Sequence, residues 1–456
     1  MNRRFDAIVI GAGQAGPPMV GRLASAGQKV ALIERNLIGG TCVNTGCTPT
    51  KTLVASAYAA HLARRGVEFG VNVGPVGVDF AAVMARKNKV VCNSRSHLEA
   101  WLRGMANCTL LEGHAHFLSP ITIGVGDDVL EAERFFINVG CRAVAPDFPG
   151  RDQVRTLTHT ALLELDALPK RLVIVGGSYV GLEFAQIFRR FGAAVTVVEK
   201  APRLTSREDE DVSDAIREIL EAEGIEIRLE SECIRFEPRG AEIAVGVNCL
   251  AGEPEVLGSH ALLAVGRCPN TDDLGLEFAG VKVDAQGYIV VDESLRTSVP
   301  HIWALGDCNG RGAFTHTSYN DFEIAAATLL DGAARKLSDR IPVYALYIDP
   351  PLGRVGLTEA EARAKGHALR IGHRPMTRVS RAVEKGETLG FMKVVVDRNT
   401  DAILGAAVLG VGGDEAIHGV IEAMAAGVTA SAYTRVLAIH PTVSELVPTV
   451  FGELSP

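Results

Sequence analysis

The chain carries the same strand, glycine turn and helix pattern twice, at one spacing. In residues 7–16 an apolar strand runs into a GxGxxG turn, and a second apolar strand ends in Glu34, 23 residues after Gly11. Residues 171–183 repeat the pattern, with Glu199 again 23 residues after Gly176. Glycines there allow a tight turn, close backbone approach to a pyrophosphate and close helix packing, while the acid bonds a ribose hydroxyl. The sequence therefore predicts two dinucleotide sites.

The second copy departs from the pattern at one position. Ser178 stands where the second glycine belongs, a change that its small size tolerates. Two dinucleotides on one chain usually exchange hydride, and a flavin with a nicotinamide is the expected pair. The turn residues predicted to bind cofactor are Gly11, Gly13, Gly16 and Glu34 at the first site, and Gly176, Ser178, Gly181, Glu199 and Lys200 at the second.

The nucleotide preference follows from the acid at the second site. A carboxylate at Glu199 suits the free 2′-hydroxyl of NADH and repels the 2′-phosphate of NADPH. Lys200, Arg203 and Arg207 follow closely and could accept a phosphate. We favour NADH over NADPH.

Two cysteines lie in the string GGTCVNTGCTPTK, residues 39–51, shortly after Glu34. Cys42 and Cys47 indicate a redox disulfide beside the first nucleotide, which would then be the flavin. On a regular helix residues five apart lie roughly 8 to 9 Å apart, beyond the ~7 Å reach of a disulfide, so the segment must bend. Asn44 and Gly46 tolerate irregular backbone. Zinc binding would need two further ligands, and none is evident.

Bulk properties exclude several classes. The 456 residues exceed one core, and the net charge of −8 argues against nucleic acid as a partner. The first strand begins at Phe5, leaving no room for an export signal, and no apolar run reaches the ~20 residues of a membrane helix. We expect a cytoplasmic protein with no membrane partner.

The rest of the sequence is predicted to complete the first domain and then to form a third, separate domain. Residues 302–307 are a short strand followed by Gly306-Asp307, whose carboxylate could bind a ribityl hydroxyl, and a helix is predicted over 320–330. Residues 391–397 and 403–410 are predicted to be paired strands, followed by a helix over 414–426. We predict an α/β protein with two Rossmann-like domains and a C-terminal α+β interface domain: 1–147 and 270–340 for FAD, 148–269 for NAD(P), and 341–456 for dimerisation.

Over essentially its whole length the chain resembles the FAD-dependent pyridine nucleotide-disulfide oxidoreductases, which include glutathione reductase, dihydrolipoamide dehydrogenase and mercuric reductase. The resemblance rests on GGTCVNTGCTPTK, both glycine turns, AVGRCPNT (264–271), ALGD (304–307) and HPTVSE (440–445). It implies a homodimer whose active sites each take a terminal His from the partner. It also implies further cofactor contacts at Gly40, Thr41, Gly266 and Thr315.

The resemblance also implies catalytic roles. Cys42 would attack the disulfide substrate, Cys47 would contact the flavin as a charge-transfer thiolate, and both thiol pKa values would be lowered. Tyr179 would swing aside for NADH. A Lys51–Glu183 pair would lie near the flavin, and His440, oriented by Glu445, would be the acid–base group.

Departures from the family narrow the substrate. Mercuric reductases carry a terminal cysteine pair and lack the His, whereas here no cysteine follows Cys308. Where glutathione reductases place arginines, this chain has Gly21 and Glu323. We therefore expect NAD(P)H-dependent reduction of a small neutral or cationic organic disulfide, and not glutathione. A mercuric or other metal-ion reductase, a dihydrolipoamide dehydrogenase and a non-catalytic redox sensor stay open.

Overall fold

The computed structural model describes residues 2–232, 234–247 and 254–455. The chain forms two compact units, each assembled from three segments. The first unit contains Met1–Thr52, Met84–Val144 and Gly266–Arg340, and the second contains Leu53–Val83, Ala145–Val265 and Ile341–Pro456. The domain boundaries predicted at 147, 269 and 340 stay predictions.

The first unit is built on a mixed sheet around the first glycine turn. Strand β1 (Asn2–Ile10) lies between the parallel strands β2 (Val30–Glu34) and β6 (Asp128–Ile137). The short strand β17 (Ile302–Ala304) pairs with β6 and so brings Gly306 and Asp307 to the same end of the sheet. The sheet is completed by β3 (Cys108–Glu112), β4 (Ala115–Ser119) and β5 (Thr122–Val125).

The second unit repeats this arrangement around the second glycine turn. A fully parallel sheet has the order β11 (Glu226–Arg228), β10 (Ala194–Val198), β9 (Arg171–Val175), β15 (His260–Leu263) and β8 (Thr156–Leu157). Strands β9 and β10 are therefore paired in parallel around the second glycine turn, as β1 and β2 are around the first. Both pairs are buried runs of aliphatic residues, as parallel strands covered on both faces require.

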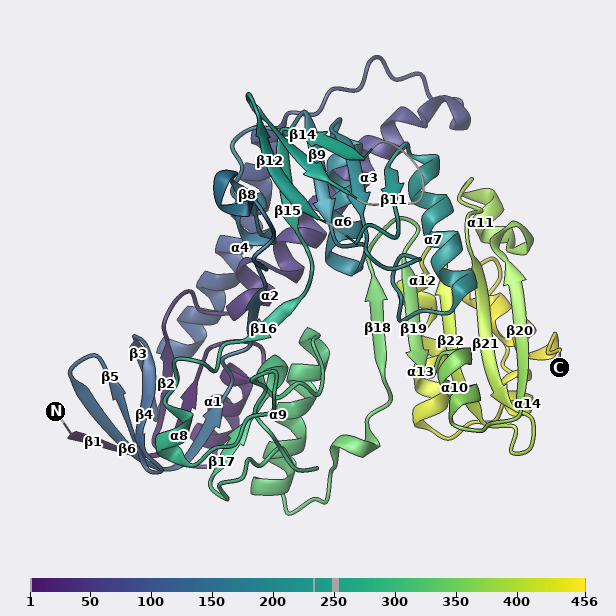
Figure 1. The fold of residues 1–456 in the computed structure, drawn as a ribbon. Helices are drawn as coiled ribbons and strands as arrows, with labels where there is room; N and C mark the ends of the chain where they lie inside the picture. Colours follow the sequence, from purple (N-terminus) through teal and green to yellow (C-terminus); the bar gives the residue numbers. More distant parts are fainter. Residues whose placement is uncertain (1, 233, 248–253, 456) are drawn as a thin grey trace. The chain divides into compact units, whose positions relative to one another are not determined.

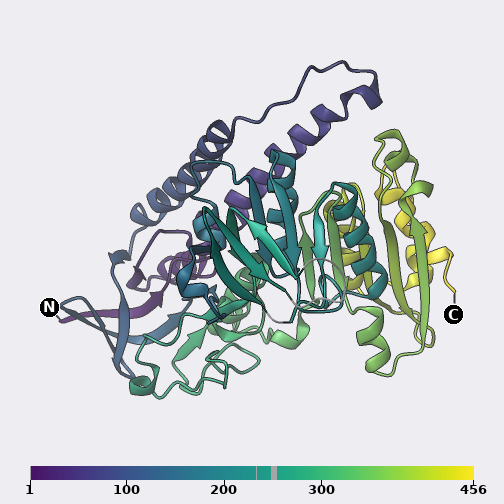
Figure 2. The ribbon, with the colours of Figure 1, turned by 45° about the horizontal axis from the view of Figure 1, so that its top comes forward.

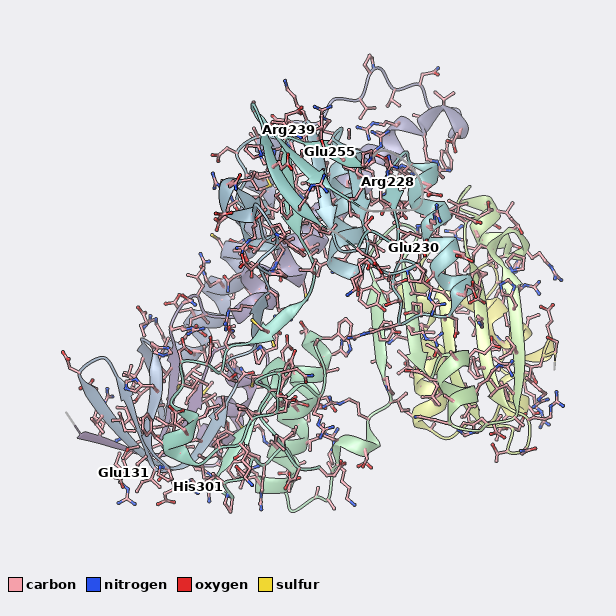
Figure 3. All side chains as sticks on the ribbon, in the orientation of Figure 1. Glu131, Arg228, Glu230, Arg239, Glu255 and His301 are labelled. Atoms are coloured by element: carbon pink, nitrogen blue, oxygen red, sulfur yellow. The ribbon has the colours of Figure 1, made fainter. Side chains whose placement is uncertain are left out.

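Smaller antiparallel pieces accompany both sheets. Strands β12 (Arg235–Arg239), β13 (Glu242–Gly246) and β14 (Glu255–Gly258) form a three-stranded sheet. Arg239 and Glu255 mark this sheet in Figure 3 and are joined by an ion pair of 3.2 Å. In the first unit, β7 (Cys141–Ala143) pairs with β16 (Arg267–Pro269).

The C-terminal part of the second unit is an antiparallel sheet with helices. Its order is β18 (Val343–Leu346), β19 (Leu352–Gly356), β22 (Ile403–Leu409), β21 (Phe391–Asp397) and β20 (Leu369–Pro375), in light green in Figures 1 and 2. The predicted hairpin over 391–410 is confirmed. The helix predicted over 414–426 is instead two helices, α12 (Gly413–Ala416) and α13 (His418–Ala425), with the chain joining them at Ile417.

Helices connect many of the strands. The helix predicted over 320–330 is confirmed but begins five residues earlier, at Thr315, as α9 (Thr315–Leu330). The longest helices are α3 (Cys47–Arg64) and α4 (Phe80–Arg103). The remaining α-helices are α1 (Gly16–Ser25), α2 (Gly40–Asn44), α5 (His159–Leu162), α6 (Tyr179–Phe191), α7 (Glu210–Ala222), α8 (Leu276–Ala279), α10 (Glu359–Ala364), α11 (Ser380–Glu384), α14 (Ala430–Tyr433) and α15 (Val447–Gly452). In the part of the chain that the structure describes, no helix has the length and apolar character needed to cross a bilayer.

Candidate functional site

The first glycine turn is closed by close backbone approaches that exclude side chains. Gly11 has φ +102°, and a Cβ there would collide with the carbonyl oxygen of Asn138. A Cβ on Gly16 would collide with the carbonyl oxygen of Gly11, which explains the third glycine of the motif. The Glu34 carboxylate accepts backbone N–H groups of Ala12 and Asn36, both at 2.8 Å. Glu34 thus lies against the turn, and its predicted contact with a ribose hydroxyl stays a prediction.

The second turn has the same construction. Gly176 has φ +116°, and a Cβ there would collide with the carbonyl oxygen of Ala264, while one on Gly181 would collide with that of Gly176. Glu199 accepts the N–H of Gly177 at 2.5 Å and that of Ala201 at 2.7 Å. Ser178 precedes α6 as its N-cap and is exposed, so its hydroxymethyl group is accommodated without displacing backbone.

Both turns fit a dinucleotide pyrophosphate. Helices α1 and α6 begin directly at the turns and carry no acidic residue in their own first turns. Such a helix end attracts phosphate through its unpaired N–H groups and its dipole. The residues present therefore suit FAD at one turn and a nicotinamide nucleotide at the other.

A loop over residues 199–209 is held against the second turn. The N–H of Thr205 donates to the carbonyl oxygen of Gly177 at 2.9 Å, and Thr205 has φ +43°. The loop carries the predicted nucleotide contacts, with Lys200 exposed and Arg203 half-buried. Glu230, marked with Arg228 in Figure 3, follows the end of β11, and its N–H donates to the carbonyl oxygen of Ala201 at 3.1 Å.

The cysteine segment bends between two helices, as predicted. Helix α2 ends at Asn44, Thr45 leaves the helical conformation, and α3 begins at Cys47. Neither Asn44 nor Gly46 has a positive φ, so the bend uses no left-handed backbone at these two residues. Gly46 is required by closeness instead: a Cβ there would lie 2.9 Å from the carbonyl oxygen of Thr41. Asn44 donates from Nδ2 to the carbonyl oxygens of Ile38 and Gly40, both at 2.9 Å.

The bend brings the two thiols together with Thr315. Cys42 is half-buried and Cys47 is exposed. The Thr315 hydroxyl lies 3.2 Å from Sγ of Cys47. The expected low pKa is wrong for Cys42: its hydrogen bond with Cys47, and then burial, raise the pKa, and a hydrogen bond with Thr315 partly opposes this. The physical reason is that the protonated Cys42 thiol keeps its hydrogen bond with Cys47 and burial penalises the thiolate, while negative charge on the Cys47 sulfur adds to both effects.

Asp307 lies at the predicted strand end, but sequence reasoning missed its partner. Arg267 Nη1 is 2.5 Å from Asp307 Oδ2, and Arg267 Nη2 donates to the carbonyl oxygen of Cys141 at 2.9 Å. Burial raises the pKa of Asp307, and Arg267 works against that shift. The position of Arg267 inside the AVGRCPNT motif was the signal that could have found it. Its neighbour Gly266 has φ +129°.

The predicted Lys51–Glu183 pair stays a prediction, because the two residues belong to different units. Lys51 is half-buried in the first turns of α3. Glu183 is buried on α6, and its Oε1 accepts the N–H of Tyr347 at 3.0 Å. This hydrogen bond fixes the Glu183 carboxylate against the chain directly after β18.

His440 and Glu445 meet as predicted. Nδ1 of His440 lies 2.9 Å from Oε2 and 3.1 Å from Oε1 of Glu445. The His440 side chain is 74% exposed, whereas that of Glu445 is 10% exposed. They line a cleft of about 620 Å³ with residues of α15 and the preceding loop. A carboxylate at Nδ1 leaves Nε2 free for proton exchange.

Tyr179 has contacts that sequence reasoning did not anticipate. Its hydroxyl donates to Glu208 Oε1 at 2.9 Å, from the first residue of α6 to the loop over 199–209. No local motif marks Glu208.

Comparisons with known proteins agree with this geometry. Residues 5–321 match the family model described as pyridine nucleotide-disulphide oxidoreductase, and residues 343–451 match the dimerisation domain of the same family. The probable pyridine nucleotide-disulfide oxidoreductase RclA of Escherichia coli is 36% identical, covering 98% of this chain and 99% of that protein. A dihydrolipoyl dehydrogenase of Thermus scotoductus is 34% identical, with 97% and 96% covered.

A solved structure is similar over the whole chain. The Cu(II) complex of the HOCl-induced flavoprotein disulfide reductase RclA from E. coli superposes with a TM-score of 0.90 at 35% identity, covering 99% of each chain. A mercuric reductase of Bacillus cereus is 32% identical, over 97% of this chain and 70% of its own length. With both glycine turns, the cysteine pair and the C-terminal domain in place, the chain belongs to the pyridine nucleotide-disulphide oxidoreductase family.

Proposed function

We propose that the protein is an NAD(P)H-dependent flavoprotein disulfide reductase whose acceptor is a small organic disulfide other than glutathione. The observation that carries the proposal is the Cys42–Cys47 pair, bent together within the unit that holds the first glycine turn. FAD, when bound, supplies two-electron transfer between the nucleotide and the dithiol. NADH and one proton would then convert one disulfide into two thiols and NAD⁺.

The dithiol and His440 account for the substrate half of the reaction. His440 takes the proton of the Cys42 thiol, the resulting thiolate attacks one sulfur of the substrate to form a mixed disulfide, and the departing thiolate takes that proton back from His440. The Cys47 thiolate then attacks Cys42 Sγ, releasing the second substrate thiolate and closing the Cys42–Cys47 disulfide. Glu445 holds the imidazole through Nδ1 and so presents Nε2 as the proton-transferring atom.

A homodimer with shared active sites is part of the proposal. Residues 343–451 match a dimerisation domain, and the loop before His440 exposes Leu437 by 98% and Ile439 by 80%. Apolar side chains so exposed beside an acid–base group indicate a surface that a second copy covers. His440 of one protomer would then serve the dithiol of its partner.

The glutathione positions support a different substrate. A Cβ at Gly21 would lie 3.3 Å from the Trp101 ring, so a larger side chain at this position would have to displace the ring. Arg22 is paired with Asp331 at 2.6 Å. Glu323 places a negative charge where the resemblance predicts a positive one, although Arg335 lies 3.5 Å away. A tripeptide with two carboxylates is therefore disfavoured.

NADH is the favoured nucleotide. Glu199 lies at the turn and accepts two backbone N–H groups, and the charge of its carboxylate repels a 2′-phosphate. Lys200 and Arg203 could bind a 2′-phosphate, so a preference for NADPH is the alternative that reduction with each nucleotide tests.

Metal-ion reduction is the second candidate. It is favoured by the mercuric reductases among the relatives and by the Cu(II) complex of a similar structure. Among the described residues no group of three His, Cys, Asp or Glu side chains could hold a metal ion. Cys42 and Cys47 are the soft sulfur ligands that this candidate would use. Turnover of Cu(II) or Hg(II) that survives replacement of His440 would favour this candidate.

One experiment tests the proposal. Purified holoprotein is reduced anaerobically with NADH and, separately, with NADPH, and then offered a panel of disulfides that includes glutathione disulfide, lipoamide and cationic disulfides. We expect rapid reduction, a long-wavelength charge-transfer band and turnover with a small disulfide. The proposal fails if neither nucleotide reduces the flavin, and glutathione disulfide as the best substrate contradicts the specificity.

The same panel separates the two remaining functions that the resemblance allows. Lipoamide as the best substrate would indicate a dihydrolipoamide dehydrogenase. Flavin reduction by NADH without turnover of any disulfide would indicate a redox sensor.

A further inference from the structure

Two tyrosines from distant parts of the chain share one carboxylate oxygen beside the second glycine turn. The hydroxyls of Tyr179 and Tyr344 donate to Glu208 Oε1 at 2.9 Å and 2.7 Å. The two rings lie 5.7 Å apart at an angle of 46°. Glu208 is buried, so these hydrogen bonds are shielded from water. We call Tyr179, Tyr344 and Glu208 the clasp.

The clasp joins two walls of the nucleotide site to the C-terminal sheet. Tyr179 opens α6 directly after the glycine turn, and Glu208 lies on the loop over 199–209, which Thr205 fastens to Gly177. Tyr344 lies on β18, which stands next to β19 in Figure 1. The first residue of α6 after the glycine turn therefore has its hydroxyl held by the loop over 199–209.

Arg354 offers Glu208 a second partner. It is fully buried on β19, and its Nε lies 3.8 Å from Glu208 Oε2. None of its guanidinium nitrogens, nor Glu208 Oε2, forms a hydrogen bond with any residue in the described part of the chain. A buried charge without hydrogen bonds is costly, so Arg354 gains when a carboxylate approaches.

The neighbouring acid of this cluster is already engaged. Asp209 lies 3.9 Å from Arg354 Nη2, but its oxygens accept the N–H groups of Glu359 and Ala360 at 3.0 Å and 3.1 Å. Lys393 lies 3.3 Å from Asp209 as well. Of these two carboxylates, Glu208 is thus the one with an oxygen, Oε2, that can accept a hydrogen bond from Arg354.

From these contacts we propose that Glu208 is a positioning residue of the nicotinamide nucleotide site, exchanging Tyr179 for Arg354 when the nucleotide enters. The inference rests on the proposed function. In the nucleotide-free protein the clasp holds the Tyr179 ring in place. When the nucleotide displaces the ring, the Glu208 carboxylate closes on the guanidinium, which offsets the lost hydrogen bond.

The test is a double-mutant cycle on the FAD-loaded dimer. Dissociation constants for NAD⁺ are measured by titration calorimetry for wild type, Tyr179→Phe, Glu208→Gln and the double variant. Tyr179→Phe keeps the ring and removes the hydroxyl that must be released, so we expect its Kd to fall about threefold to tenfold. In the Glu208→Gln background the same change should alter Kd by less than about twofold, because the two groups act through one hydrogen bond.

The controls separate the clasp from general effects. Tyr58→Phe removes a matched tyrosine–carboxylate hydrogen bond, to Glu387 at 2.7 Å, and should leave Kd unchanged. Stopped-flow reduction by NADH should show the same fall in apparent Kd for Tyr179→Phe. If Glu208→Gln fails to fold, the sign of the Tyr179→Phe effect still decides, since an unchanged or higher Kd overturns the clasp.

The outcomes also separate the clasp from the proposed function. The clasp alone is overturned if the wild-type protein binds NAD⁺ and is reduced normally, but Tyr179→Phe changes Kd equally in the wild-type and Glu208→Gln backgrounds. Wild type that neither binds nor is reduced by either nucleotide overturns both.

Discussion

The hydroxyl of Thr315 lies 3.2 Å from the sulfur of Cys47, although the two residues are 268 positions apart. Thr315 is the first residue of α9, so the N-terminal end of that helix approaches the dithiol. A hydrogen bond from Thr315 lowers the pKa of Cys42 against the larger raising effects of Cys47 and burial. The resemblance had predicted Thr315 only as a cofactor contact.

Replacing Thr315 should therefore lower the rate at which the dithiol reacts with an alkylating agent at neutral pH. Thr315→Val removes the hydroxyl, raises the pKa of Cys42 further and lowers its thiolate fraction, so alkylation of the reduced enzyme by iodoacetamide should slow about threefold to tenfold. Thr315→Ser keeps the hydroxyl and should react like wild type. Equal rates for valine and threonine would contradict a hydrogen-bonding role.

Arg267 should be needed to retain FAD. Arg267→Met removes the ion pair of the buried Asp307 carboxyl, which raises its pKa further and favours the neutral form of the group predicted to bind the ribityl chain. We expect a clear fall in the ratio of flavin to protein absorbance after purification. Arg142→Met breaks a comparable arginine–aspartate pair on the surface, with Asp272 at 2.8 Å, and should keep full flavin content.

His440 should matter for the substrate half of the reaction only. His440→Gln removes the acid–base group, so disulfide turnover should fall about 10²- to 10⁴-fold while anaerobic flavin reduction by NADH keeps its wild-type rate. Glu445→Gln should have a smaller effect, because the imidazole keeps its place but loses the charge at Nδ1. His418→Gln, an exposed histidine at the start of α13, is the control. A parallel loss of flavin reduction in His440→Gln would argue against this division.

Asp397 should stabilise the C-terminal sheet in a pH-dependent way. The hydrogen bond from His367, followed by those from the N–H groups of Thr400 and Asn399, lowers the pKa of Asp397 to about 2. The folded-state pKa of Asp397 lies below its unfolded value of about 3.9. The stabilisation is therefore complete when the pH is above about 3.9, and it is lost as the pH falls through about 2. Asp397→Asn should therefore lower Tm at about pH 7, with the difference from wild type closing between about pH 4 and about pH 2. A Tm difference that persists at the acid end of this range would contradict the linkage.

Local patterns predicted much of this protein. The two glycine turns, their acids 23 residues on, and the bend between Cys42 and Cys47 all depend on residues close in the sequence, where backbone sterics and strand or helix periodicity decide the conformation. The hairpin over 391–410 was equally local. The break at Ile417 and the early start of α9 were missed, because tertiary packing decides where helices begin and end.

The sequence by itself determined which chemistry the chain carries: two dinucleotide turns, a cysteine pair and a histidine with its carboxylate five residues on. Only the tertiary structure decided which side chains tune that chemistry. Thr315 contacts Cys47, and Arg267 pairs with Asp307, 40 residues away in the sequence. Glu208 accepts a hydrogen bond from Tyr179, 29 residues away in the sequence. Such contacts follow no periodicity, because they depend on which strand ends and loops the folded sheets bring together. The cysteine pair was evident in the sequence, whereas the raised pKa of Cys42 arises from the bend and burial that bring its neighbours to it.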